Sequence, residues 1–343
     1  MRLALVFALA LTMHAAAAQP LQALATYQGA DREQRLLEGA RKEGSVAFYA
    51  TFPSEYAKEL IEPFEKRTGI KVNHWRARSE ILMQKVLTEA RGGAANVDVI
   101  SIISPQTETL RREGLLQEVH SPHHKDLVPF AVPAHREWVS ILQHAFVHAY
   151  NTRLVRKEEL PRSFRDLLDP KWKGKLGIEG DDHEWLSSVI ADLGQADGAK
   201  LFREIVATNG ISVRSGHPLL TNLVASGEIP LALTVYQYSV EQAKKKGSPI
   251  DWFVIGQAVS ITNAVTVTRK APHPHAALLF YDHLVSPEGQ RALAKIGYVP
   301  THTQVESPVK GVKLKLLDAA TLLDEQDKST RLFEQIILKS AAR

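Results

Sequence analysis

Apolar and polar residues alternate along the first third of the chain in the manner of strands separated by amphipathic helices. The segments Ser45–Ala50, Ile70–Trp75 and Val97–Ile103 are short and rich in branched or aromatic residues, which predicts three strands. Between the first two, apolar side chains recur at helical spacing from Ala57 to Phe64. The order strand, helix, strand, helix, strand is typical of a parallel sheet wound by helices.

The same alternation continues through the rest of the chain. The further predicted strands are Ile141–Tyr150, Leu176–Ile178, Ile211–Val213, Ile229–Val235, Ile250–Ile255 and Ser260–Thr268. The further predicted helices are Pro161–Leu168, Trp185–Leu193, Ala199–Thr208, Pro218–Ala225, Glu241–Lys246, His275–Leu284, Glu288–Ile296 and Asp324–Lys339. No sequence repeat of 20 to 50 residues is found. We therefore expect two wound sheets, with strand ends and helix N-termini facing a cleft.

The N-terminus has the three-part pattern of a secretory signal peptide. Met1-Arg2 supplies positive charge, Leu3–Met13 is apolar and uncharged, and four alanines precede an expected cleavage site between Ala18 and Gln19. The apolar run of about 11 residues is shorter than the roughly 20 that a spanning helix needs. The alternative is a short buried helix. We predict a signal peptide at 1–18, lobe 1 at 19–145 and 257–305, lobe 2 at 146–256, and a C-terminal helical segment at 306–343.

The composition narrows the range of functions. The chain has no cysteine, which excludes disulfides, thiolate metal sites, a cysteine nucleophile and a lipid anchor on an N-terminal cysteine. It is 44% apolar and 23% charged, as is ordinary for a globular protein. The net charge of +4 is small and dispersed, so it indicates solubility and does not indicate nucleic-acid binding. An exported protein without an anchor fits the bacterial periplasm.

Several segments, in order along the chain, resemble the extracellular solute-binding proteins of bacterial ABC importers, in the branch of the ferric-ion-binding proteins. They are Gly44–Tyr49, Phe64–Val72, Val97–Val99, Ala149–Thr152, Leu168–Lys175, Ala225–Glu228, Ser286–Gln290 and Gly297–Pro300. The resemblance implies a two-lobed type II periplasmic-binding fold with α/β lobes, each a mostly parallel sheet flanked by helices, and two crossovers between the lobes.

The tyrosines after the predicted strand Ile229–Val235 are the first candidate ligand residues. In the ferric branch, two adjacent tyrosines at this strand end ligate the metal through phenolate oxygens. Tyr238 matches the second of these, Gln237 falls on the first, and Tyr236 is displaced by one residue. The resemblance therefore implies iron ligation by Tyr238 and Tyr236 only in part, and packing of one ring within the lobe is the alternative.

Two loops that precede helices in lobe 2 supply further candidates. The family loop that holds an anion with small polar residues is acidic here, with Asp181, Asp182 and His183. Aspartates at that place favour a cationic group, a polyol or a metal ion, or they simply cap the helix. In the second loop, Ser215 and His217 are candidates, because His217 aligns with a family asparagine of the cleft.

Candidates in lobe 1 lie at its strand ends. Where the ferric branch has its histidine and glutamate ligands, this chain has Pro53 and the neighbourhood of Ile103. Arg76 and Arg78 have the paired donors that grip an anionic group, or they belong to a solvated helix start. The full set of candidates in this lobe is Thr51, Phe52, Arg76, Arg78, Ser79, Ser101 and Ser104.

These observations favour a binding module that captures a small solute in the interlobe cleft and presents it to an inner-membrane ABC permease. We expect a monomer without a cofactor, whose transported ligand is a small polar organic solute or ferric iron. A secreted enzyme with a carboxylate-lined cleft is the alternative, although the sequence motifs of hydrolases, P-loop proteins, zinc proteases and dinucleotide-binding proteins are absent. His144 and His148 lie in a predicted strand without the glutamate of the helical zinc motif. A sensor subunit would use the same fold.

Overall fold

The computed structural model describes residues 21–338, so the predicted signal peptide lies outside the described residues. The chain divides into two compact units. Unit 1 contains the described residues up to Gln143 with Thr262–Ile296 and Pro300–Ser307, and unit 2 contains His144–Ile261, Gly297–Val299 and the described residues from Pro308 onward. The chain therefore passes from one unit to the other within β4 (Val139–Asn151) and within β9 (Ala258–Val267), which are the two expected crossings. It changes unit again at Gly297, Pro300 and Pro308.

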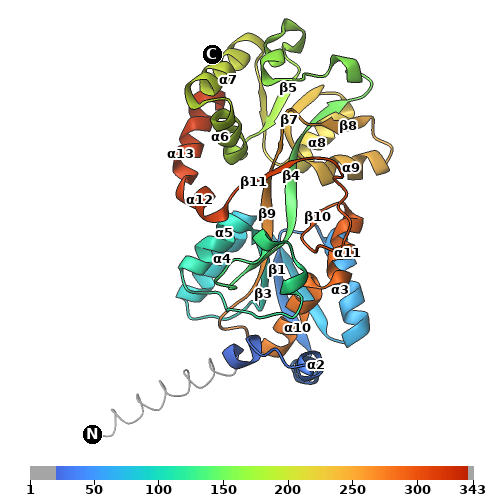
Figure 1. Ribbon diagram of the computed structural model, residues 1–343, viewed down its shortest axis with the longest axis vertical. Coiled ribbons are helices and arrows are strands. Elements are labelled where there is room, and N and C mark those ends of the chain that lie inside the picture. Colours follow the sequence, from blue (N-terminus) through green and yellow to red (C-terminus); the bar gives the residue numbers. More distant parts are fainter. Residues whose placement is uncertain (1–20, 339–343) are drawn as a thin grey trace, which may run out of the picture. The chain divides into compact units, whose positions relative to one another are not determined.

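Unit 1 is built on a four-stranded mixed sheet of order β2-β1-β3-β9. Strands β1, β2 and β3 are parallel, and β9 runs antiparallel to β3. Helices α4 and α5 lie on one side of this sheet, and α3, α10 and α11 on the other (Figure 1). The elements are α2 (Arg32–Glu43), β1 (Ser45–Ala50), α3 (Ser54–Thr68), β2 (Lys71–Arg76), α4 (Ser79–Arg91), β3 (Val99–Ile103), α5 (Ser104–Arg112), β4 (Val139–Asn151), β9 (Ala258–Val267), α10 (Pro274–Val285), α11 (Pro287–Ile296) and β10 (Val299–Pro300).

The core of unit 1 forms where the sheet meets α3 and α10. The ring of Phe280 packs edge-on against Phe48 of β1 at 5.0 Å and Phe64 of α3 at 4.9 Å between centroids. All three side chains are fully buried. Asp98, just before β3, is also fully buried, and its carboxylate accepts hydrogen bonds from the Ala47 amide and from both the amide and ring of His273. Through these hydrogen bonds, Asp98 links β1 to the start of α10.

Unit 2 has its own mixed sheet, in which β5 lies between β7 and β6 and is parallel to both. Strand β4 runs antiparallel to β7 and β8. Helices α6 and α7 lie on one side of the sheet, and α8 and α9 on the other (Figure 1). The elements are β5 (Leu176–Glu179), α6 (His183–Asp192), α7 (Gln195–Asn209), β6 (Ser212–Arg214), α8 (His217–Ser226), β7 (Leu231–Tyr236), α9 (Gln237–Lys245), β8 (Ile250–Phe253), β11 (Leu314–Leu316), α12 (Ala319–Asp324) and α13 (Gln326–Phe333).

Buried asparagines hold in place two of the segments that resemble the solute-binding family, Ala149–Thr152 and Leu168–Lys175. Asn151 donates to the carbonyl oxygens of Val224 and Ala225 at the end of α8 and accepts from the Arg153 amide. It therefore anchors the end of β4 to the last turn of that helix, whose orphan carbonyls need donors. Asn209 does the same for the turn around Asp169, by donating to two backbone carbonyl oxygens there.

The structure departs from the sequence predictions at three places. Residues Phe164–Leu168 form a 3-10 helix, and the C-terminal helix is divided into α12, α13 and a π-helical turn at Glu334–Leu338. Helix α9 begins at Gln237, directly after β7, so Tyr238 lies in a helical turn and strand alternation no longer applies to it. Within residues 21–338, no helix is both long and apolar enough to cross a bilayer.

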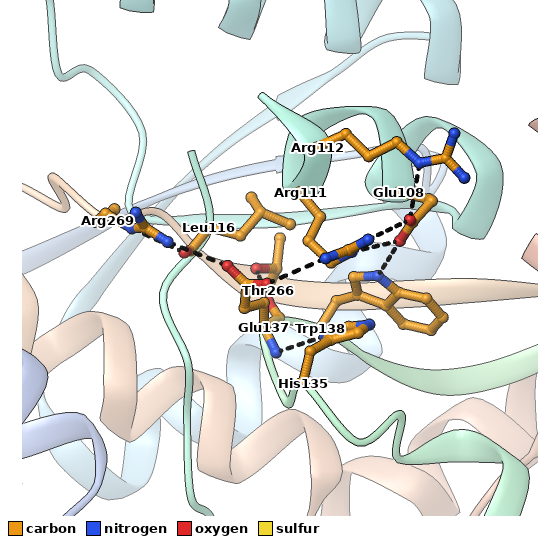
Figure 2. A network of polar contacts seen from close by, with 9 residues as sticks. All are labelled: Glu108, Arg111, Arg112, Leu116, His135, Glu137, Trp138, Thr266 and Arg269. Carbon is orange, nitrogen blue, oxygen red and sulfur yellow. Dashed lines mark hydrogen bonds and ion pairs between the residues drawn. The ribbon is translucent and has the colours of Figure 1, made fainter. Parts of the chain in front are cut away.

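A network of charged side chains fixes α5 in unit 1 (Figure 2). Arg111 donates two hydrogen bonds to the Glu108 carboxylate, at 2.8 and 2.7 Å, and Arg112 and the Trp138 indole donate at 3.1 and 3.3 Å. The Glu108 side chain is only 4% exposed. Burial alone would raise the pKa of Glu108, but the donors outweigh it and bring the pKa to about 2.

This network predicts a pH-dependent effect of Glu108→Gln. Because the pKa of Glu108 is depressed in the folded state, its stabilisation is fully present above the ordinary carboxyl pKa and is lost as the pH falls towards 2. We expect the variant to lose about 3 kcal/mol of unfolding free energy at pH 7. The deficit should shrink below pH 4.5, as measured by urea denaturation. Glu113→Gln, at an exposed neighbouring position, is the control. A deficit independent of pH would contradict this account.

Candidate functional site

The candidate site of unit 2 lies where three parallel strands end. Strands β5, β6 and β7 are parallel, so their carboxyl ends share one edge of the sheet. Helices α6, α8 and α9 begin just beyond those ends. In open α/β sheets this edge is where ligands bind, and helix N-termini make it electropositive. Here the edge carries a cluster of carboxylates, imidazoles and phenols.

Glu179, the last residue of β5, joins the two loops of the site. Its carboxylate oxygens accept hydrogen bonds from the amides of Asp181 at 2.6 Å and Gly216 at 2.7 Å. Gly216 has a φ of 101°, a conformation that glycine adopts without strain. Glu179 is 2% exposed. It therefore occupies, from inside the protein, amide donors that would otherwise be offered to an anion.

Asp182 stands at the N-cap of α6, yet its side chain makes no capping hydrogen bond. Its Oδ1 lies 3.2 Å from Nε2 of His217, the first residue of α8. Its Oδ2 is buried and has no hydrogen-bond partner among the described residues. Asp182 therefore does not cap α6 through its side chain, which was one of the alternatives predicted from the sequence. One of its carboxylate oxygens instead contacts His217.

The Tyr236 ring lies between two histidine rings. Its centroid is 3.8 Å from that of His217 and 4.6 Å from that of His144, which is stacked on it. Phe146 packs against the same tyrosine at 5.1 Å. This sandwich identifies Tyr236 as the packed ring of the pair and holds the imidazole of His217 in place beside Asp182.

Tyr238 continues the aromatic surface. Its ring is nearly parallel to that of Tyr236 at 6.0 Å and lies 4.4 Å from the ring of Tyr298. His144 contacts both Tyr238 and Tyr298, at 5.9 and 5.6 Å. Tyr238 is partly exposed, whereas Tyr298 is buried. Both predicted tyrosines are partly exposed and differ in their neighbours, since Tyr236 packs on His217 and Tyr238 packs on Tyr298.

The close packing of these groups shifts their pKa values. Burial would lower the pKa of His217, but the Asp182 carboxylate reverses the effect and the pKa is raised. Burial and the Asp182 charge raise the pKa of Glu184 to about 8 and also raise that of Glu179. The pKa of Tyr236 is raised well above its ordinary value, mainly by burial. The site thus holds protons more tightly than isolated side chains would, as expected where negative charge gathers.

Four of the predicted site residues of unit 2 lie together, and the other three do not. Asp182, His217, Tyr236 and Tyr238 lie together in the cluster. Asp181 and Ser215 are exposed. The His183 ring packs edge-on against Phe333 of α13 at 5.0 Å, which makes it a contact to the C-terminal segment.

In unit 1, two of the predicted residues meet around Asn263. Its amide donates to Thr51 at 3.1 Å, and its carbonyl oxygen accepts from Ser101 at 3.3 Å. Ser101 is fully buried. The remaining predictions differ in their surroundings: Phe52 and Ser104 are buried, Ser79 accepts a long hydrogen bond of 3.4 Å from the Ile103 amide, and Arg76 and Arg78 are exposed.

Sequence reasoning missed Glu179, His144 and Tyr298. Glu179 carried a usable signal, because it is a lone carboxylate at the end of an apolar strand and directly before a glycine. His144 and Tyr298 carried none, since each lies within an apolar stretch and reaches the cluster through contacts distant in sequence. The pKa of His144 is lowered to about 3 by burial and by the His217 charge, so this imidazole is neutral.

The fold and the comparisons with known proteins define the chain as a solute-binding protein. The family model for bacterial extracellular solute-binding proteins matches residues 59–317, and the chain belongs to that family. It is 26% identical over 318 residues to the major ferric iron-binding protein of Neisseria meningitidis, covering 86% of this chain and 93% of that protein. It is 22% identical over 256 residues to a putative 2-aminoethylphosphonate-binding periplasmic protein of Salmonella typhimurium, covering 71% and 74%.

Solved structures agree on the architecture. The crystal structure of iron-bound HitA from Pseudomonas aeruginosa superposes with a TM-score of 0.73 at 22% identity, over 85% of this chain and 99% of that one. The chain therefore has the type II periplasmic-binding fold that its sequence resembles, and the predicted fold class is confirmed.

The geometry of the pair predicts how His217 titrates in protein freed of metals with a chelator. Because the Asp182 carboxylate raises the pKa of His217 against the effect of burial, Asp182→Asn should lower that pKa. The measurement is an NMR titration of the His217 ring protons, assigned with a His217→Gln variant. Asp181→Asn, which removes the exposed neighbouring carboxylate, should leave the pKa close to that of the wild type. Equal effects of the two substitutions would contradict the proposed pairing.

Proposed function

We propose that this protein is the periplasmic capture subunit of an ABC importer, which binds a positively charged cargo and presents it unaltered to an inner-membrane permease. Membership of the solute-binding family supports the binding role, and a relative described as periplasmic supports the location. The protein acts as a monomer after removal of residues 1–18. No chemical step on the cargo is part of this proposal.

The sign of the cargo's charge follows from Asp182. A buried carboxylate oxygen without a partner among the described residues is costly unless something else pairs with it. The neighbouring Glu179 carboxylate already occupies the loop amides that would bind an anion. An anion would thus meet two carboxylates, and the amides of Asp181 and Gly216 would not be available to bind it. A cation, in contrast, would pair with the free oxygen of Asp182.

The aromatic surface beside the acids suits an organic cation. Tyr238 has a partly exposed ring beside that of Tyr236, and ammonium groups bind over such aromatic faces with about 0.5–2 kcal/mol. A small solute with an ammonium end therefore fits this part of unit 2. In unit 1, Thr51 and Ser101 form one hydrogen-bonded group with Asn263, and Arg76 and Arg78 stay predicted contacts.

A thermal-shift screen of the mature protein tests this function. At a hundred times its Kd, a ligand of the native state stabilises it by about 2.7 kcal/mol, which raises the Tm by several degrees. We expect ethanolamine-type amines, 2-aminoethylphosphonate with its ammonium group, or metal ions to act, and simple anions such as acetate and methylphosphonate to fail. Asp182→Asn should abolish the shift, and Asp197→Asn, at an exposed position of α7, should preserve it. A screen in which only simple anions stabilise would contradict the proposal.

Ferric iron is a second candidate cargo. Two observations favour it: relatives named as ferric iron-binding proteins cover most of the chain, and the Tyr238 ring is partly exposed beside that of Tyr236. Tyr236 does not fit the role of an iron ligand, because burial raises the pKa of its phenol well above the ordinary value and the ring is enclosed by two histidines.

Colour distinguishes this candidate. Phenolate bound to Fe(III) absorbs visible light, so iron held by Tyr238 should give a band that Tyr238→Phe removes. Tyr150→Phe, which alters a tyrosine of β4 outside the cluster, is the matched control and should keep the band. A colourless protein after loading with ferric citrate, or a band that survives Tyr238→Phe, would contradict ferric ligation by this residue.

A further inference from the structure

The unpaired oxygen of Asp182 points to a ligand of defined chemistry. An aspartate at an N-cap ordinarily accepts a hydrogen bond from the helix, and losing that bond costs about 1 kcal/mol. Asp182 forgoes it although the residue is only 2% exposed, and Oδ2 finds no other partner in the described part of the chain. The side chain is therefore held for contact with something that binds to the folded protein.

Three potential ligand atoms converge at this point. One atom each from Glu179, Asp182 and His217 lies within 4.8 Å of the other two. The His217 Nε2 and Asp182 Oδ1 atoms are 3.2 Å apart. Two ligands of a tetrahedral ion with bonds of about 2.0–2.1 Å lie about 3.3 Å from each other. A metal ion can thus bind this pair without separating the two side chains.

The residues around the three ligands fix their positions, as the surroundings of protein metal sites commonly do. Each oxygen of the Glu179 carboxylate accepts one backbone amide, which leaves lone pairs for a cation and prevents rotation. Tyr236 packs on the His217 imidazole with 3.8 Å between centroids. The cluster is therefore ordered by contacts that do not depend on a bound ion.

The ligand set selects the class of ion. One imidazole and two carboxylates suit Zn²⁺ and other divalent first-row ions, whereas Ca²⁺ takes six to eight oxygen ligands. Two carboxylates also balance a double positive charge. We propose that Glu179, Asp182 and His217 bind a divalent first-row transition-metal ion, with Zn²⁺ as the best match. The inference rests on the proposed function, because it names this ion as the positively charged cargo, and it requires no tyrosine ligand.

Calorimetric titration of the chelator-treated mature protein with Zn²⁺ tests the inference. We expect one Zn²⁺ per chain and an increase in Kd of at least tenfold in Asp182→Asn, Glu179→Gln and His217→Gln. Asp197→Asn, an exposed acid of the same unit, should bind like the wild type. Circular dichroism establishes that each variant is folded. Titration with Co²⁺ gives a readout on the unaltered chain, since a four-coordinate site produces intense visible bands and a six-coordinate one does not.

The outcomes separate this inference from the function on which it rests. If an amine raises the Tm and Zn²⁺ does not bind, the metal assignment is overturned and cation capture stands. If neither an amine nor Zn²⁺ binds, the metal assignment and the proposed cation capture are both overturned. Zn²⁺ binding that survives all three substitutions, or Co²⁺ bands of the six-coordinate kind only, would also overturn the assignment.

Discussion

The site depends on the requirement that positive potential at the end of a parallel sheet be balanced by negative charge. Three helices begin beyond the carboxyl ends of β5, β6 and β7, and their unpaired amides attract anions. In this protein the balancing charge is built into the chain, because the Glu179 carboxylate binds the amides of Asp181 and Gly216. Once that place is filled, a second carboxylate nearby becomes surplus negative charge.

Asp182 carries this additional negative charge, which affects the pKa values of the residues around it. Burial and the Asp182 charge together raise the pKa values of Glu179, Glu184 and Tyr236, and the Asp182 carboxylate raises the pKa of His217 against the effect of burial. Like charges held this close destabilise the folded protein while no cation is bound. Capture of a cation relieves the repulsion and pairs the Asp182 oxygen that is left without a partner among residues 21–338.

Much of the fold could be predicted from the pattern of residues. Strand β1 has the predicted bounds, and β3 falls inside its predicted apolar run, because strands covered on both faces are continuous in apolar residues. The broken C-terminal helix could not be predicted, since helical spacing alone does not fix where a helix is interrupted. The junction of β7 and α9 was missed for a similar reason, and it changes how Tyr238 is placed.

The candidate site could be predicted only in part. Asp182 and His217 were identifiable because each lies in a loop before a helix, where ligands commonly bind. Their pairing was not, since it depends on contacts between residues 35 positions apart. Whether Asp182 caps its helix or faces His217 is decided by side-chain packing, as with the Tyr236 sandwich, and neither arrangement leaves a mark in local sequence. The bounds of the two lobes and the contacts of unit 1 remain predictions.

The most direct measurement is an anomalous-difference X-ray map, recorded above and below the zinc absorption edge, for crystals of the mature protein grown with Zn²⁺. The account predicts one strong peak about 2 Å from Asp182 and His217, with Glu179 completing the protein ligands. A map with no peak at this cluster, in crystals where Asp182 instead accepts a hydrogen bond from the first turn of α6, would contradict it.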